Sequence, residues 1–271
     1  MQFRLEVVIF FYNGRMAELF AYVGETGDPG TSGRASQAFG MAALVLGPRG
    51  VAEARILADR FRSEFGIGND RPLSWKKYVR EHDRRRYVAR EISKLPDAQV
   101  TYTYCRKAEV DYGSFVNDRG KLYNYVAAKT YKSILWTAKF WDGEVGASTV
   151  LTRFGHVRGF DHEKTTRPYV RRSVDSDRKI SGELERGLFW VDARNYREAM
   201  IADLFAGCLH SAITEDEYGS TDGGYLLQTW PLVRKVGGCA IPFGVLSIPA
   251  NELVTTLEWF PCRNCRYKKA Q

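Results

Sequence analysis

The stretch AYVGETGDPGTSG, residues 21–33, decides how the rest of the sequence is interpreted, because an apolar run ends there in acids and turn residues. The run from Leu19 to Val23 has the composition of a buried β-strand. Glu25 and Asp28 follow it directly, among glycines and a proline that are typical of a turn. Functional sites of open α/β sheets lie at the carboxyl ends of strands. The two acids therefore have two compatible interpretations, as turn residues and as candidate site residues.

Strand-like and helix-like segments alternate along the chain. Apolar or alternating runs predict further strands at 38–47, 98–105, 148–154 and 187–193. Apolar residues at helical spacing predict helices at 51–65, 75–95, 121–141 and 196–213. Such alternation is typical of an α/β layer architecture with a partly parallel sheet.

The chain of 271 residues has the length of one large domain or of one domain with insertions. We divide it into an N-terminal extension of uncertain status (1–15), a main domain (16–235) and a C-terminal extension (236–271) that contains a C-x-x-C pair. The apolar patch from Val7 to Phe11 is either an extra edge strand or a segment that precedes a true start at Met16.

The net charge of +8 indicates either an anionic partner, most often nucleic acid, or a solvated basic surface. No apolar run approaches the roughly 20 residues of a membrane helix, so no membrane partner is expected. No secretory signal is recognisable and the cysteine count is odd, which together predict a reduced, cytoplasmic protein.

The C-terminal cysteines Cys262 and Cys265 have metal-ligand spacing. A zinc site needs four ligands, commonly two such pairs, and only Cys239 lies nearby in the sequence. The sequence therefore favours two ordinary thiols over a structural zinc ion.

Two further acids are candidate site residues. Asp203 lies on one stripe of the strongest amphipathic helix with Ala199, Ala206 and His210, and should be partly buried there. A buried carboxylate needs a cation or a hydrogen-bond partner, so a site residue and the member of a salt bridge are both possible. Asp192 ends an apolar strand, where it is either a site residue or the first acid of a helix.

Carboxylates at strand ends and on a packed helix suit Mg²⁺ or Mn²⁺, which prefer oxygen ligands. The candidate metal ligands are the four acids Glu25, Asp28, Asp192 and Asp203. His156 and His210 are candidate groups for proton transfer.

Residues 155–172 form a polar, basic segment in which aromatic residues are interleaved. Basic and aromatic side chains together can hold phosphates and stack on bases, although a polar surface insertion explains the segment slightly better. The candidate nucleic-acid-binding residues are Arg158, Lys164, Arg167, Arg171 and Arg172.

The stretches FAYVGETGDPG (20–30) and REAMIADLFAGCLHSAI (197–213) resemble the bacterial family catalogued as domain of unknown function 3800. Members of that family typically open with a strand ending in Y-x-D-E-S-G-D/N-x-G and close with a helix near Q-x-A-D-L-x-A-G. The resemblance extends from about Met16 to about residue 235. It implies a ribonuclease H-like fold, a mixed sheet flanked by helices, here with a polar basic insertion before the last strand. It also implies metal-dependent cleavage of nucleic acid.

By this resemblance, Glu25 matches the motif glutamate, Asp28 its later acid and Asp203 the aspartate of the closing helix, while Asp192 lies where members often keep an acid. Gly24 departs from the motif, because the leading aspartate is expected there. Glu25 does not simply replace it, since adjacent strand residues point to opposite faces. The strand at 148–154 also lacks the acid that such folds often carry.

These observations support three hypotheses. The first is a Mg- or Mn-dependent nuclease acting on nucleic acid phosphodiesters, and the second is a catalytically inactive module on the same fold that binds nucleic acid or another partner. The third is a small-molecule phosphohydrolase.

Overall fold

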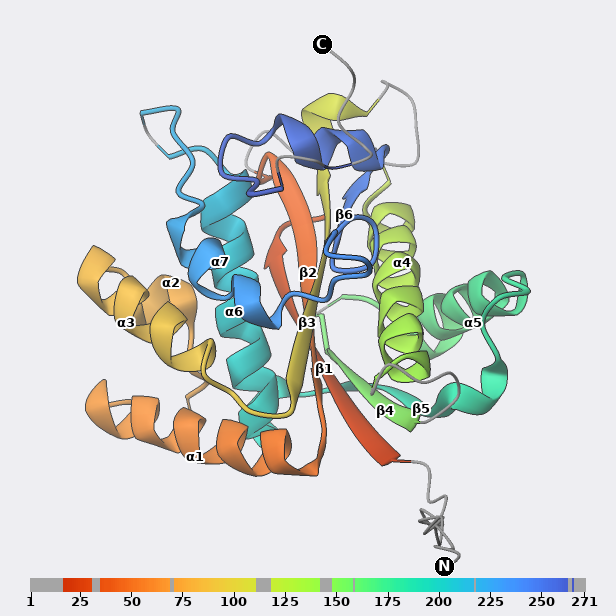
Figure 1. The fold of residues 1–271 in the computed structure, drawn as a ribbon, viewed down its shortest axis with the longest axis horizontal. Helices are drawn as coiled ribbons and strands as arrows, with labels where there is room; N and C mark the ends of the chain where they lie inside the picture. The colour runs from red at the N-terminus through yellow and green to blue at the C-terminus, as the bar shows by residue number, and fades with distance from the viewer. Residues whose placement is uncertain are drawn as a thin grey trace, which may run out of the picture.

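The computed structural model describes residues 17–30, 35–68, 71–110, 118–141, 148–157, 159–216, 218–262 and 265 (Figure 1). The predicted N-terminal extension, residues 1–15, lies outside these ranges.

A six-stranded mixed sheet forms the centre of the molecule, with strand order β5-β4-β1-β2-β3-β6. The strands are β1 (Ala17–Gly27), β2 (Ala38–Leu46), β3 (Ala98–Arg106), β4 (Ser148–Gly155), β5 (Glu185–Val191) and β6 (Val245–Ile248). β2 is antiparallel to both of its neighbours, whereas the pairs β1–β4, β4–β5 and β3–β6 are parallel. The carboxyl ends of β1, β4 and β5 therefore meet at one edge of the sheet.

Helices cover both faces of the sheet (Figure 1). One face carries α1 (Pro48–Glu64), α2 (Trp75–Tyr78), α3 (His82–Ile92), α6 (Arg197–Ile213) and α7 (Gly224–Gln228). The other face carries α4 (Arg119–Lys139) and α5 (Arg167–Asp175). Short helical turns occupy Lys107–Glu109, His162–Thr166, Gly182–Leu184, Ala193–Asn195, Trp230–Leu232 and Asn251–Thr256. This arrangement confirms the predicted α/β class, a mixed sheet flanked by helices.

Two apolar cores lie on the two sides of the sheet, and β1 contributes to both. Tyr22 belongs to the core beneath α6, while Ala21 and Val23 belong to the core beneath α4. Because side chains alternate along a strand, Gly24 faces α6 and Glu25 faces α4. This alternation fixes the side of the sheet on which each site residue lies.

The prediction of one helix over residues 75–95 is wrong, since α2 ends at Tyr78 and α3 begins at His82. The break leaves backbone carbonyls without helical partners, and arginines of α3 bind them. Arg84 donates to the carbonyl of Tyr78 at 2.8 Å, and Arg85 donates to that of Val79 at 3.1 Å. The periodicity continues across the break, so the sequence pattern could not reveal it.

The sequence pattern predicted that β5 is the last strand along the chain, and this prediction is wrong. The segment assigned to the C-terminal extension supplies β6, which pairs with β3 from Tyr102↔Val245 to Cys105↔Ile248. The predicted basic insertion lies between β4 and β5 and contains α5. Within the described residues, no helix is both long and apolar enough to span a bilayer.

Candidate functional site

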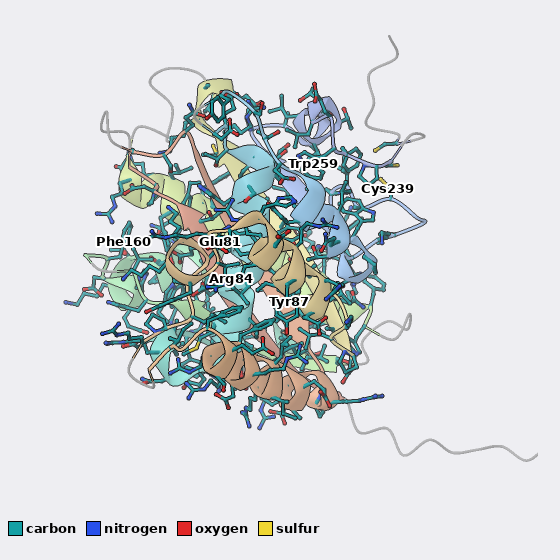
Figure 2. The ribbon with its side chains drawn as sticks, turned by 90° about the vertical axis from the view of Figure 1, so that its left-hand side faces the viewer. Glu81, Arg84, Tyr87, Phe160, Cys239 and Trp259 are labelled. Atoms are coloured by element: carbon teal, nitrogen blue, oxygen red, sulfur yellow. The ribbon has the colours of Figure 1, made fainter. Side chains whose placement is uncertain are left out.

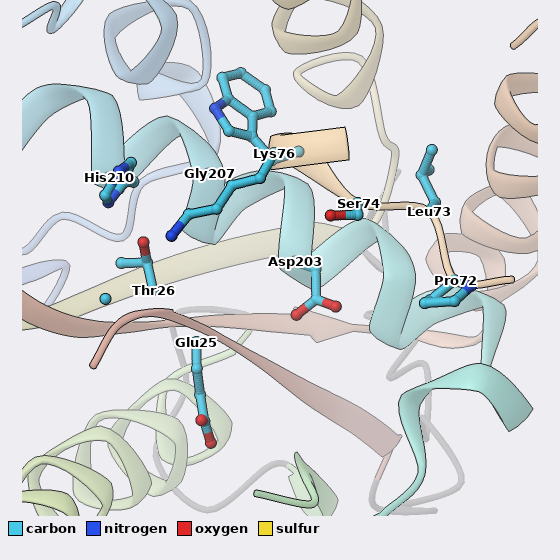
Figure 3. Close-up of a pocket in the computed structure, with 11 residues that line it drawn as sticks. Glu25, Thr26, Pro72, Leu73, Ser74, Lys76, Asp203, Gly207 and His210 are labelled. Atoms are coloured by element: carbon cyan, nitrogen blue, oxygen red, sulfur yellow. The ribbon is translucent and has the colours of Figure 1, made fainter. Parts of the chain in front are cut away.

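A pocket of about 310 Å³ opens at the carboxyl end of β1 (Figure 3). Its walls come from β1, from the segment that leads into α2 and from α6. The residues that line it are Glu25, Thr26, Gly27, Pro72, Leu73, Ser74, Trp75, Lys76, Asp203, Gly207 and His210. Three of the predicted site residues, Glu25, Asp203 and His210, border this pocket, although the Glu25 carboxyl points away from Asp203 to the other face of the sheet (Figure 3).

Gly24 and Gly207 allow the walls of the pocket to pack closely. A Cβ atom at Gly24 would lie 2.5 Å from the carbonyl oxygen of Ala202 in α6, closer than any real contact. A Cβ atom at Gly207 would overlap the ring of Trp75. The glycine at position 24 is therefore required by the approach of α6 to β1, and an aspartate does not fit there without a shift of the helix.

Asp203 projects from α6 toward β1 and is partly buried (Figure 3). Burial raises the pKa of its carboxyl to about 7, although the backbone N–H of Glu25 donates to it and acts in the opposite direction. The ladder between β1 and β4 ends at Val23↔Phe154, whereas β1 continues to Gly27. Asp203 therefore reaches the edge of β1 that β4 leaves open.

Glu25 extends from the same strand to the opposite side, toward α4 (Figure 3). Burial raises its pKa to about 8, and the negative charge of Asp203 adds to this effect. Tyr123 of α4 donates a hydrogen bond to Glu25 Oε1 at 2.8 Å, and Trp190 Nε1 donates to the Tyr123 hydroxyl at 3.2 Å. These two aromatic residues were not predicted, because they look like ordinary core positions in the sequence.

His210 and Lys76 complete the polar lining. Burial, and next the positive charges of Lys76 and Arg85, lower the pKa of His210 to about 4, so its imidazole is neutral near pH 7. The Lys76 side chain extends into the pocket from α2 (Figure 3). The pocket therefore combines an acid, a neutral imidazole and an ammonium group.

The structure places Asp28 and Asp192 apart from this pocket lining. Asp28 Oδ1 accepts the backbone N–H of Gly30 at 2.5 Å, as in a turn. Asp192 is paired with Arg194 at 2.5 Å, and this partner lowers its pKa to about 2. Among the described residues, the four predicted acids do not form a group of three or more with ligand atoms within 4.8 Å of one another.

An aromatic cluster lies beyond Glu25, next to the carboxyl ends of β4 and β5. The His162 ring stacks on Trp190 with centroids 5.3 Å apart, and His156 contacts it edge-on at 5.1 Å. Burial, and next the charge of His156, lower the pKa of His162 to about 4. His162 Nε2 accepts the backbone N–H of Val157 at 3.1 Å, so this histidine is a packed residue while His156 is exposed.

Most of the predicted nucleic-acid-binding residues that the structure describes form ion pairs with acidic side chains. Lys164 pairs with Asp161 at 3.5 Å, Arg167 with Glu163 at 2.8 Å, and Arg171 with Glu185 at 2.8 Å. Arg172 is exposed on α5. Arg158 lies outside the described residues.

A second group of exposed and partly exposed cations, which the sequence pattern did not single out, lies on α2, α3 and the turn between them, and Arg84 of this group is labelled in Figure 2. It consists of Lys76, Lys77, Arg80, Arg84, Arg85 and Arg86, and within the described part of the chain none of these six forms an ion pair with an acid. We call these six residues the α2–α3 surface. Lys76 belongs both to this surface and to the pocket lining, so the two features are continuous. The run REHDRRR was the available signal, but the fold decides that this surface adjoins the pocket through Lys76.

Comparison with known proteins yields little. No family model matches the chain, and no curated protein matches it. A chain of the solved structure described as "Structure of the PCNA:RNase HII complex from Archaeoglobus fulgidus" is similar to it, with 14% sequence identity over 82% of this chain and 92% of that chain, and a TM-score of 0.37. A TM-score this low supports no statement about function, and the architecture rests on the sheet of this chain itself.

Proposed function

We propose that this chain has a ribonuclease H-like fold, binds nucleic acid and hydrolyses its phosphodiester bonds with Mg²⁺ or Mn²⁺ held by Asp203 and Glu25. The observation that carries the proposal is the pair of partly buried carboxyls at the carboxyl end of β1, with pKa values raised to about 7 and about 8. Such acids hold protons near neutral pH because burial disfavours their charged form. A divalent cation would take the place of those protons.

The open edge of β1 is a suitable position for the cation. Asp203 reaches this edge from the α6 side and Glu25 lies on the α4 side, beyond the last pair of the β1–β4 ladder. Mg²⁺ commonly binds one or two carboxylates together with waters and substrate phosphates, so the pair needs no further acid from the protein. When bound, the ion would polarise the phosphodiester and activate a water molecule.

The α2–α3 surface supports a polyanionic substrate. Its six cations adjoin the pocket through Lys76 and lack acidic partners within the described residues. Phosphate contacts by Lys and Arg supply most of the sequence-independent affinity for nucleic acid. We infer that the backbone of the nucleic acid follows α2 and α3 and enters the pocket past Lys76.

Membership of the family of domain of unknown function 3800 is part of this proposal, and the position of Asp203 of α6 beside the carboxyl end of β1 supports it. A cytoplasmic setting is also part of it, because all five cysteines are free thiols.

A second candidate function is a nucleic-acid-binding module without catalysis. The packing at Gly24 favours it, since a side chain at this position would collide with the backbone of α6. The α2–α3 surface would serve this function equally well. Only the metal and cleavage experiments separate the two candidates.

The decisive experiment measures metal binding and cleavage in the same preparations. We expect Mn²⁺ to raise the melting temperature of the wild type and to support cleavage of labelled single- or double-stranded DNA or RNA. Asp203→Asn should remove both effects. The matched control is Glu53→Gln, which alters an exposed acid of α1 away from the pocket.

Two outcomes would contradict the nuclease. The first is a melting temperature that does not respond to Mn²⁺ or Mg²⁺. The second is a response that persists in Asp203→Asn, which would place the ion elsewhere. Tight binding of nucleic acid without metal response or cleavage would support the non-catalytic module instead.

A further inference from the structure

Three cysteines from two distant parts of the chain converge near the C-terminal end of the described structure. The Sγ atoms of Cys239, Cys262 and Cys265 all lie within 4.8 Å of one another. Cys265 is buried, and the other two are partly buried against the same apolar core. Cys239 is labelled in Figure 2. This cluster is separate from the pocket lined by Asp203.

The spacing of the sulfur atoms fits a shared metal ion better than a disulfide. The distance between Cys239 Sγ and Cys265 Sγ is 3.5 Å. A disulfide requires about 2.05 Å, whereas two thiolates bound to zinc at about 2.3 Å in tetrahedral geometry lie about 3.8 Å apart. Three soft sulfur ligands favour zinc over Mg²⁺ or Ca²⁺.

The backbone around Cys239 forms a tight turn and offers a hydrogen bond to its sulfur. Gly237 and Gly238 both have positive φ, 57° and 79°, which forms a tight turn that pairs Val236 with Cys239. The backbone N–H of Ile241 donates a hydrogen bond to the Cys239 sulfur. Donation of an N–H to a ligand sulfur is a typical outer-shell interaction of metal sites.

We propose that Cys239, Cys262 and Cys265 bind one zinc ion, with water or an added small ligand in the fourth position. The sequence favoured ordinary thiols because it offered one C-x-x-C pair and a single distant cysteine. The fold supplies the third ligand by bringing the turn at Cys239 against the C-terminal segment.

The position of this site gives it a structural role. The chain between Cys239 and Cys262 contains β6, a four-residue edge strand, and Trp259, whose Nε1 donates to the carbonyl of Ala212 at 2.7 Å. Zinc would close this segment into a loop and hold β6 on β3. Metal binding at such a site contributes to folding stability because the unfolded chain lacks the preformed ligand set.

The full chain is first purified without a metal-affinity step. Its zinc content is then measured by elemental mass spectrometry. We expect about one zinc ion per chain, its loss on treatment with a chelator, and a fall in melting temperature with that loss. Cys262→Ser, at a partly exposed position, should bind zinc much more weakly. Cys105→Ala, which removes a buried thiol outside the cluster, should retain it.

Cobalt substitution keeps the test decisive even if a variant fails to fold. Wild type reconstituted with Co²⁺ should show intense sulfur-to-cobalt charge-transfer absorption and the visible bands of a tetrahedral ion. Wild type that binds neither zinc nor cobalt would overturn the proposal. So would a Cys239–Cys265 disulfide in the protein isolated under reducing conditions, or undiminished zinc in Cys262→Ser.

Discussion

The basic segment between β4 and β5 and the α2–α3 surface are both rich in arginine and lysine, but their charges have different surroundings. In the first, Lys164, Arg167 and Arg171 each form an ion pair. In the second, Arg80, Arg84 and Arg85 donate to backbone carbonyls, and none of the six cations forms an ion pair with an acid within the described residues. The two regions also lie on opposite sides of the sheet (Figure 1). The comparison teaches that basic composition alone does not identify a phosphate-binding surface.

The largest expected effect comes from reversing charges on the α2–α3 surface. Lys77→Glu, Arg80→Glu and Arg86→Glu combined should weaken nucleic-acid binding on the order of 100-fold and reduce the slope of log K against log salt by about 2, because lost phosphate contacts release fewer counterions. Fluorescence anisotropy with labelled DNA and RNA over a salt series measures both quantities.

The matched control reverses three exposed cations of the other region, Lys164→Glu, Arg172→Glu and Arg178→Glu. We expect a much smaller change in affinity and an unaltered salt slope. If the control weakens binding more than the α2–α3 variant, the segment between β4 and β5 is the interface and our assignment is wrong.

Gly24→Ala should show how tightly the side of the sheet that carries the pocket is packed. The added Cβ atom meets the backbone of α6, which cannot move aside as a flexible side chain can. We expect the free energy of unfolding to fall by about 1–3 kcal/mol. Gly182→Ala, in the basic segment, is the control, because nothing lies within 4 Å of its Cβ position. Urea denaturation of both variants tests this, and equal stabilities would contradict the observed close approach.

The pH dependence of stability should report on the carboxyl pair. A carboxyl whose pKa is raised from 3.8 to about 7 on folding binds more protons in the native state, so metal-free protein should lose stability as the pH rises from about 4 to about 7. Asp203→Asn should flatten this slope, and so should Mn²⁺ in the wild type. Thermal unfolding across the pH range is the measurement. Asp175→Asn, an exposed acid of α5, should leave the slope unchanged.

The smallest effect concerns the hydroxyl that holds Glu25. Tyr123→Phe removes a hydrogen bond to a buried group and should cost about 1 kcal/mol of stability. It should also raise the pKa of Glu25 further, since this bond favours the charged carboxylate. Tyr169→Phe on α5 is the control, because its hydroxyl makes no hydrogen bond within the described residues. If Tyr169→Phe lowers the free energy of unfolding more than Tyr123→Phe does, the hydrogen bond from Tyr123 to Glu25 does not contribute the expected stability.

Much of the fold follows from local patterns. The apolar runs that form β1 and β2, and the broad apolar face of α6, are visible in the sequence because burial imposes a period of two on strands and of 3.6 on helices. β6 escaped notice because four residues carry too little periodicity to distinguish a strand from a loop. The break between α2 and α3 escaped notice because the helical periodicity continues across it, while side-chain hydrogen bonds from Arg84 and Arg85 stabilise it.

For the candidate site, the sequence by itself determined that Glu25 lies near the carboxyl end of a strand and that Asp203 lies on a helical stripe beside the core, because both follow from local patterns. The expectation that Glu25 follows the strand was wrong, since β1 continues through it to Gly27. Only the tertiary structure decided that Asp203 and His210 line one pocket while the Glu25 carboxyl points toward α4. The fold also decided that Asp28 and Asp192 are bound to Gly30 and Arg194, and that three cysteines converge. It also decided that position 24 must be a glycine, since the nearest atoms belong to a helix almost 180 residues away. Contacts between segments far apart in the chain depend on how helices pack on the sheet, and local sequence patterns do not encode that packing.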